Sequence, residues 1–176
     1  MRKLVLILFA SLMLVPATAL AERATPGDGS LVVSNANGRV TVSGHGLIYG
    51  YVDNGSVTVV GNYTPDDATS LSSITGGKQS IVGKNVAYSG SGVRFYFPGG
   101  QYSLIVEGTG IDISAVGKGT ISALGAGLPD DGSFTIDGGK PRSIDNSQGS
   151  YAFGKNGGVT ASVSTVTGVS TSAKGH

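Results

Sequence analysis

The chain has 176 residues, with 12 basic and 11 acidic side chains and a formal net charge of +1. Cysteine and tryptophan are absent, whereas glycine occurs 30 times. The lack of cysteine excludes disulfide frameworks, thiolate metal sites and cysteine nucleophiles. The balanced charge, with basic residues scattered singly, argues against nucleic acid as a partner, because neutralising phosphates requires clustered Lys and Arg.

The segment Met1–Ala21 has the three parts of a secretory signal peptide. Arg2 and Lys3 are followed by the apolar stretch Leu4–Val15, and the segment closes on Ala19-Leu20-Ala21. Small residues at this spacing predict cleavage between Ala21 and Glu22, and so a secreted or cell-envelope protein. The alternative is an uncleaved anchor, but the stretch is shorter than the roughly 20 residues of a membrane span. No second such run follows, so we expect no transmembrane span after cleavage.

Composition after the signal segment favours β-structure. Gly, Ser, Thr and Val are abundant, whereas good helix formers are scarce, which suits short strands with many turns. We expect a linker at 22–27, one all-β domain at 28–169 and a disordered tail at 170–176. Within that domain, the alternation of Val or Ala with Ser or Thr over 159–167 predicts a last strand.

An internal repeat is the most informative feature of the mature segment. Val40–Asp67 aligns with Leu104–Asp131: glycines coincide, as at Gly55 and Gly119, and both copies end on Pro-Asp-Asp. We interpret this as two β units, at about 28–91 and 92–146, with a partial third from 147. Two units suit paired sheets better than a stack of many coils. The prediction is an antiparallel β-sandwich or jelly-roll-like fold, with a β-solenoid as the alternative.

Glycine-containing turns separate the expected strands. Asp53-Asn54-Gly55 lies between the apolar-rich runs 47–52 and 56–60, and Asn-Gly in such a place predicts a β-hairpin. At the matching place of the second unit, Gly117-Lys118-Gly119 lies between 111–116 and 120–124, which predicts a second hairpin.

Several runs alternate with the period of a half-buried antiparallel strand. Ile111, Ile113 and Ala115 are expected to face the core, with Asp112 and Ser114 outward. By the same pattern, Phe95 and Phe97 are expected inward, with Arg94 and Tyr96 outward.

Paired acids recur in both units, at Asp66 and Asp67 and again at Asp130 and Asp131, each pair after a proline. Such carboxylates can bind calcium or serve acid–base hydrolysis. Pro followed by Asp is also ordinary turn chemistry, in which Asp accepts hydrogen bonds from nearby amides. We expect turns first, with calcium as the alternative cofactor and no other cofactor.

Tyrosines supply the second set of candidate binding residues. Tyrosine is an amphipathic side chain of the kind found at recognition faces, and six are candidates: Tyr49, Tyr51, Tyr63, Tyr88, Tyr96 and Tyr102. Of these, Tyr49 and Tyr51 are selected as binding candidates, and the alternative is that the tyrosines fill the edge of the sandwich. His45 is the only histidine before the C-terminal His176, so a Ser–His–Asp triad would have to use it. The sequence has no Gly-x-Ser-x-Gly elbow to support one, and we assign no catalytic residue.

The stretch from Arg94-Phe95-Tyr96-Phe97 to Gly117 resembles uncharacterised, secreted, glycine-rich β-proteins of bacteria, actinobacteria among them. The resemblance extends over about 40–139 and implies no activity and no site residue.

These observations favour a secreted, non-enzymatic structural or adhesive β-module of the cell envelope or extracellular space. A glycan- or small-ligand-binding domain, with or without calcium, is the first alternative, and a secreted hydrolase is the second. The expected partner of this protein is a glycan or a protein of the cell surface.

Overall fold

The computed structural model describes residues 27–66, 72–147 and 149–154. The described residues form eight strands, paired antiparallel in one continuous sheet. In chain order the strands are β1 (Gly29–Val59), β2 (Ser73–Thr75), β3 (Lys78–Val82), β4 (Asn85–Phe97), β5 (Gln101–Gly125), β6 (Ser133–Ile136), β7 (Arg142–Ser143) and β8 (Gly149–Phe153).

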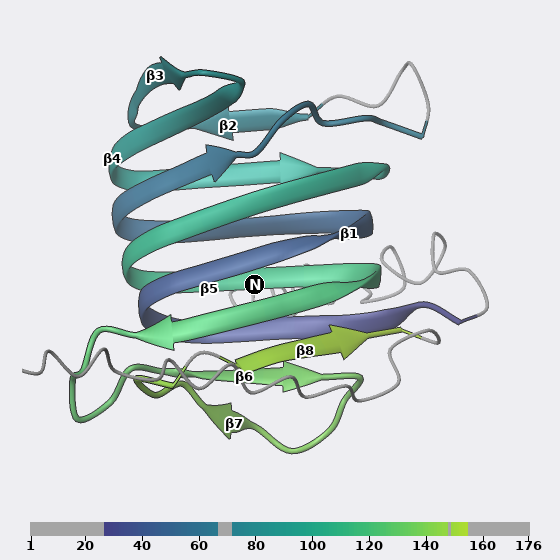
Figure 1. The fold of residues 1–176 in the computed structure, drawn as a ribbon, viewed down its shortest axis with the longest axis vertical. Coiled ribbons are helices and arrows are strands. Elements are labelled where there is room, and N and C mark those ends of the chain that lie inside the picture. The colour runs from purple at the N-terminus through teal and green to yellow at the C-terminus, as the bar shows by residue number, and fades with distance from the viewer. Residues whose placement is uncertain (1–26, 67–71, 148, 155–176) are drawn as a thin grey trace, which may run out of the picture.

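Two long strands, β1 and β5, build most of the molecule. β1 has 31 residues, which would extend about 100 Å in a straight strand. Instead, β1 and β5 wind together into a flattened coil (Figure 1). Val40 of β1 shows the consequence, since it pairs with Val106 on one side and with Ala123 on the other.

The coil has two walls, between which β1, β4 and β5 pass back and forth. Wall A contains, in order across the strands, 78–82, 85–90, 55–59, 101–108, 38–45, 118–125 and 149–153. Wall B contains 73–75, 91–97, 46–54, 109–117, 29–36, 133–136 and 142–143.

Glycines mark the places where the long strands cross from one wall to the other. At one edge, which we call the glycine edge, five glycines lie in consecutive strands: Gly125, Gly38, Gly108, Gly55 and Gly90. At the opposite edge Gly117 pairs with both Gly29 and Gly46. This second edge also carries His45, and we call it the histidine edge.

The five glycine positions of the glycine edge leave no room for a side chain. A Cβ at Gly108 would lie 2.1 Å from the Asn54 carbonyl oxygen and 2.8 Å from the Gly55 Cα. Gly108 also has a φ of +146°, a conformation that side-chain-bearing residues rarely adopt. Both observations give the same reason for glycine at the crossings.

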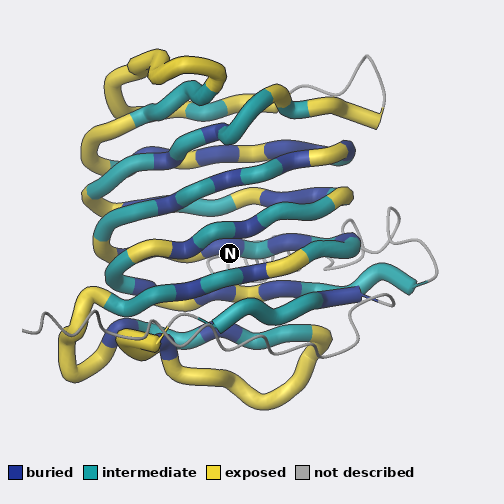
Figure 2. The backbone as a smooth tube through the Cα atoms, in the orientation of Figure 1, coloured by how far each residue is buried: buried dark blue, intermediate teal, exposed yellow. Residues whose placement is uncertain are grey.

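The apolar core lies between the walls, and burial alternates along much of β1 and β5 and along 93–97 of β4 (Figure 2). Ile111, Ile113 and Ala115 are buried, as are Phe95 and Phe97, which confirms the inward faces expected from the sequence. The other buried hydrophobic residues include Leu31, Val33, Val40, Val42, Ile48, Val52, Val57, Val93, Leu104, Val106, Ile121, Phe134 and Phe153.

The predicted all-β, antiparallel fold is confirmed. The two predicted hairpins are wrong, because Asn54 and Gly55 lie inside β1 and Gly117 to Gly119 lie inside β5. Glycine permits positive φ in both segments, but there it lets the strand bend from one wall to the other at an edge of the molecule. Gly55 therefore pairs with Gly108 and Gly90 on its two flanks, and the chain does not reverse there.

The aligned segments both begin in wall A, at Val40 in β1 and at Leu104 in β5, but they run toward opposite edges. Gly55 and Gly119, which match in the alignment, each lie beside a crossing between walls, Gly55 at the glycine edge and Gly119 at the histidine edge. The two-walled arrangement is consistent with the sandwich expectation, although continuous strands join the walls.

Part of the sequence-based prediction lies outside the described residues. This part comprises the signal segment, the cleavage residues Ala21 and Glu22, the linker up to residue 26, the expected strand at 159–167 and the tail at 170–176. Over the residues that are described, the chain forms no helix of the length and apolarity needed to cross a membrane.

Gly108→Ala tests the glycine edge. We expect a loss of about 2–4 kcal/mol in the free energy of unfolding, because the new methyl group must displace backbone atoms and adopt a strained φ. Gly83→Ala is the matched control: its φ is also positive (+66°), but nothing lies within 4 Å of its Cβ position. The control should cost only about 1 kcal/mol. Equal losses in urea unfolding would contradict the packing argument.

Tyr102 is a buried phenol whose hydroxyl has no hydrogen-bond partner among the described residues. Burial raises its pKa. An unpaired buried hydroxyl costs about 1–3 kcal/mol, so Tyr102→Phe should stabilise the fold and raise the melting temperature. Tyr102→Leu is the control that also removes the ring, and it should destabilise. A lower melting temperature for the Phe variant would show that the hydroxyl is satisfied in solution.

Candidate functional site

Asp131 is a structural residue of the loop that follows β5. It is the only charged side chain buried among the described residues, with 4 % exposure. Its Oδ2 accepts hydrogen bonds from the amides of Gly127 at 2.8 Å and Leu128 at 3.2 Å. A Cβ at Gly125 would lie 2.3 Å from the same oxygen, so the loop closes tightly over the carboxylate.

The other described acids of the two Pro-Asp-Asp sequences are also engaged. Asp130 Oδ1 accepts the Gly132 amide at 2.9 Å, and Asp66 Oδ1 lies 2.7 Å from His45 Nε2. Asp67 lies outside the described residues. The predicted turn chemistry therefore holds for Asp130 and Asp131, whereas Asp66 makes a side-chain pair that the sequence pattern did not indicate.

The structure does not bring the two acidic sequences together. Asp131 lies at the glycine edge beside Gly125, and Asp66 lies at the histidine edge. The extended run 38–45 separates these edges. Among the described residues, no three His, Cys, Asp or Glu side chains are grouped so as to hold a metal ion.

Asp131→Asn distinguishes loop closure from metal binding. We expect the variant to lose about 1–3 kcal/mol of stability, because a buried charge-assisted acceptor is weakened. Asp130→Asn, whose carboxylate is exposed, should lose less. Both should melt at the same temperature with and without millimolar calcium. A calcium-dependent rise in wild type that disappears in Asp131→Asn would instead establish a cation site.

Tyrosines gather on the outer side of wall B. Tyr49 in β1 pairs directly with Tyr96 in β4, and their side chains are 37 % and 44 % exposed. Residues paired directly across neighbouring strands form one rung of the sheet. The rung of Tyr49 and Tyr96 continues to Ser114 in β5 on one side and to Ser73 in β2 on the other. Residues directly opposite on neighbouring strands have Cβ atoms about 4.5–5.5 Å apart. Two exposed phenol rings are thus held side by side.

The next rung adds charge to this surface. Tyr51 pairs with Arg94, and the guanidinium carbon lies 5.3 Å from the Tyr51 ring centroid. A hydrogen bond to the Asp53 carboxylate raises the pKa of Tyr51. Asp112 pairs with Tyr51 from the other side, and its Oδ1 accepts the Asn35 amide at 3.0 Å. We call Tyr49, Tyr51, Arg94 and Tyr96 the tyrosine face.

Gly50 keeps the tyrosine face in place from beneath. It lies between the two outward tyrosines of β1 with its own Cβ direction toward the core, where the Phe95 ring would be 2.5 Å away. The Phe95 ring therefore packs against the backbone of the adjacent strand. This packing anchors both tyrosine-bearing strands to the core.

Two shallow grooves cross the tyrosine face. One, of about 380 Å³, is lined by Tyr49, Tyr96, Arg94 and the β2 residues Ser73 and Thr75. The other, of about 270 Å³, lies between Tyr51, Arg94 and the Asp112–Ser114 segment. The larger groove is within the usual range of small-ligand sites, about 300–1,000 Å³.

The outer side of wall A differs in chemistry. Its rungs carry mainly small hydroxylated residues, as in the pairing of Thr41 with Ser122 and of Ser43 with Ser103. The Ser43 and Ser103 hydroxyl oxygens lie 2.8 Å apart. The two walls therefore present an aromatic face and a hydroxyl-rich face.

Tyr49, Tyr51 and Tyr96 were among the tyrosines predicted as candidates for binding, whereas Arg94 was not. The sequence did indicate that Arg94 and Tyr96 face outward, since they alternate with the inward Phe95 and Phe97. The alternation does not give the register of strand pairing, and only the register shows that Tyr96 lies opposite Tyr49.

Searches for known relatives gave no match to a protein-family model, to a curated protein or to a solved structure.

Proposed function

We propose that the protein is a secreted, non-enzymatic adhesive β-module that binds glycans through the tyrosine face. The observation that supports this most directly is the pairing of Tyr49 with Tyr96, two exposed aromatic side chains from strands far apart in sequence. The signal-like segment Met1–Ala21 supports the extracellular setting of the proposal.

Aromatic rings suit sugars because one side of a sugar ring is lined by C–H groups, which pack on a ring face, while its hydroxyls remain free for hydrogen bonds. Tyrosine provides the ring and a polar tip together. Around the rings, Arg94, Ser73 and Thr75 supply donors and acceptors at the margin of the larger groove. This is the mixture of apolar floor and a few polar groups expected of a small-ligand site.

The fold supports an adhesive role more than a catalytic one. The tyrosine face lies on paired strands backed by the core and not on loops, so it is pre-ordered and little side-chain entropy is lost on binding. A flat face also gives access to a polymer at any point along its length. The proposal is therefore a surface that holds a polysaccharide, without a chemical step.

Co-sedimentation of the exported protein with cellulose, chitin and peptidoglycan tests this proposal. We expect binding to at least one polymer, and we expect Tyr49→Ala and Tyr96→Ala each to weaken it about tenfold, since a buried aromatic contact commonly contributes more than about 1 kcal/mol. Tyr49→Phe is the matched control: it keeps the ring and should keep most of the affinity.

Thr58→Ala on wall A provides a second control and should leave binding unchanged. Absence of binding to every polymer, or equal binding by the Tyr49→Ala and Tyr49→Phe variants, would contradict the proposed role of the aromatic face.

A further inference from the structure

A cleft of about 470 Å³ lies at the histidine edge, on wall A. It is lined by residues from three parts of the chain, which include Ser43 and His45 in β1, Asn62 after β1, and Gln101, Ser103 and Lys118 in β5. The tyrosine face lies on the other wall, so this cleft is a separate place on the molecule.

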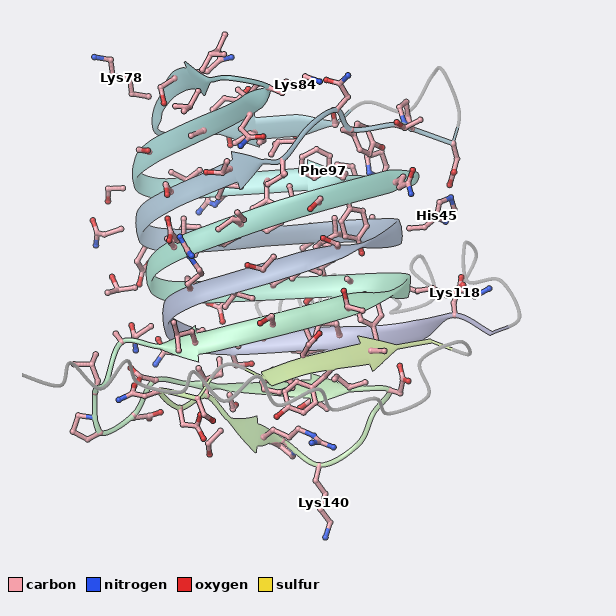
Figure 3. All side chains as sticks on the ribbon, in the orientation of Figure 1. His45, Lys78, Lys84, Phe97, Lys118 and Lys140 are labelled. Atoms are coloured by element: carbon pink, nitrogen blue, oxygen red, sulfur yellow. The ribbon has the colours of Figure 1, made fainter. Side chains whose placement is uncertain are left out.

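Strand pairing fixes three of these side chains in one rung. His45 pairs with Gln101 on one side and with Lys118 on the other, so three consecutive strands, each about 4.8 Å from the next, carry an amide, an imidazole and an ammonium group. Figure 3 shows His45 and Lys118 at the same edge, with Lys78, Lys84 and Lys140 elsewhere. The positive group is therefore placed by the fold beside two polar neighbours.

The segment after β1 is tied down over this rung. Thr64 and Gln101 exchange two backbone hydrogen bonds, at 3.0 and 2.7 Å. The Tyr63 hydroxyl donates to the Gly99 carbonyl, and its ring meets Phe97 edge-on with centroids 4.9 Å apart. These contacts hold Asn62 at the rim of the cleft.

Some of the charged side chains around the cleft form salt bridges and others do not. Asp66 is paired with His45 at 2.7 Å, and the other salt bridge among the described residues joins Arg39 to Glu107. Neither pair uses Lys118. The residues that line the cleft thus include one lysine, Lys118, and two residues with side-chain amides, Asn62 and Gln101, whereas Asp66, which pairs with His45, is not among them.

We propose that this cleft binds an oxyanion, the carboxylate or sulfate of an acidic sugar, with Lys118 as the charged contact and Asn62 and Gln101 as hydrogen-bond donors. Charge-assisted hydrogen bonds to an ionised acceptor are about twice as strong as neutral ones. The Ser43 and Ser103 hydroxyls beside the rung suit the hydroxyls of a sugar ring that carries the anion. This site would act independently of the tyrosine face.

Titration of the exported protein with D-glucuronate, followed by amide chemical shifts in NMR spectra, tests the proposal. We expect shifts centred on Gly44, Gln101 and Lys118, and no comparable shifts with D-glucose, which has the same ring without the carboxylate. Sulfate alone separates two sources: affinity equal to that of glucuronate identifies the oxyanion as the ligand, and weaker affinity identifies the acidic sugar. Equal binding of glucose and glucuronate would overturn the proposal.

Variants locate the charged contact. Lys118→Gln should weaken glucuronate binding at least tenfold, Lys118→Arg should retain most of it, and Asn62→Ala should weaken it several-fold. Lys140→Gln, which removes the same charge far from the cleft, is the matched control and should bind as wild type does. Equal losses in Lys118→Gln and Lys140→Gln would reduce the effect to overall charge and would overturn the site. Binding to the Tyr49→Ala variant should be unchanged.

Discussion

The close approach of backbones at the glycine edge is the constraint on which the rest of the structure depends. Gly108 stands between Gly55 and Gly38 in neighbouring strands, and a single methyl group there would collide with a carbonyl oxygen 2.1 Å away. Because these residues have no side chains, β1 and β5 can turn sharply from wall to wall. Their pairing shifts register at the turn, as between Ala36 and Gly38, and resumes on the next wall. Two walls and the core between them follow from that turn, and the glycines at the crossings therefore have a steric cause.

Flat walls determine how side chains can gather. On a paired strand, outward residues of neighbouring rungs lie close together whatever their separation in the sequence, so Tyr49 meets Tyr96 and His45 meets Lys118. The core fixes both sets from beneath, as the Phe95 ring does against Gly50. The candidate binding surfaces of this protein therefore depend on the register of strand pairing. A shift of one strand by a single position would abolish them, because it reverses which side chains face outward.

Sequence reasoning predicted the features that local pattern controls. Alternation identified the inward faces around Ile111 and Phe95, and composition predicted the antiparallel all-β class. The hairpin at Asn54-Gly55 was wrong because positive φ serves equally for a chain reversal and for a strand that bends, and the two differ only in what pairs across it. The partner that decides, Gly108, lies far away in the sequence, in β5. The pairing of His45 with Asp66 was hidden for a related reason: it depends on Tyr63 and Thr64, which attach their segment to the Gly99–Gln101 turn.

The two proposed sites follow from the same architecture with opposite chemistry. Wall B has tyrosines where wall A has small hydroxylated residues, so an apolar ring face is favoured on one side and a charged or hydroxylated group on the other. Both sites lie on the runs that enter and leave the histidine edge, because Tyr49 follows closely after His45 in β1. A branched or bent acidic polysaccharide that reached around this edge could contact both, and the effective concentration of the second contact would then raise the avidity of two weak sites. From that geometry we expect the losses of affinity in Tyr49→Ala and Lys118→Gln to multiply in the double variant when the ligand is a polymer. They should not multiply when the ligand is a monosaccharide.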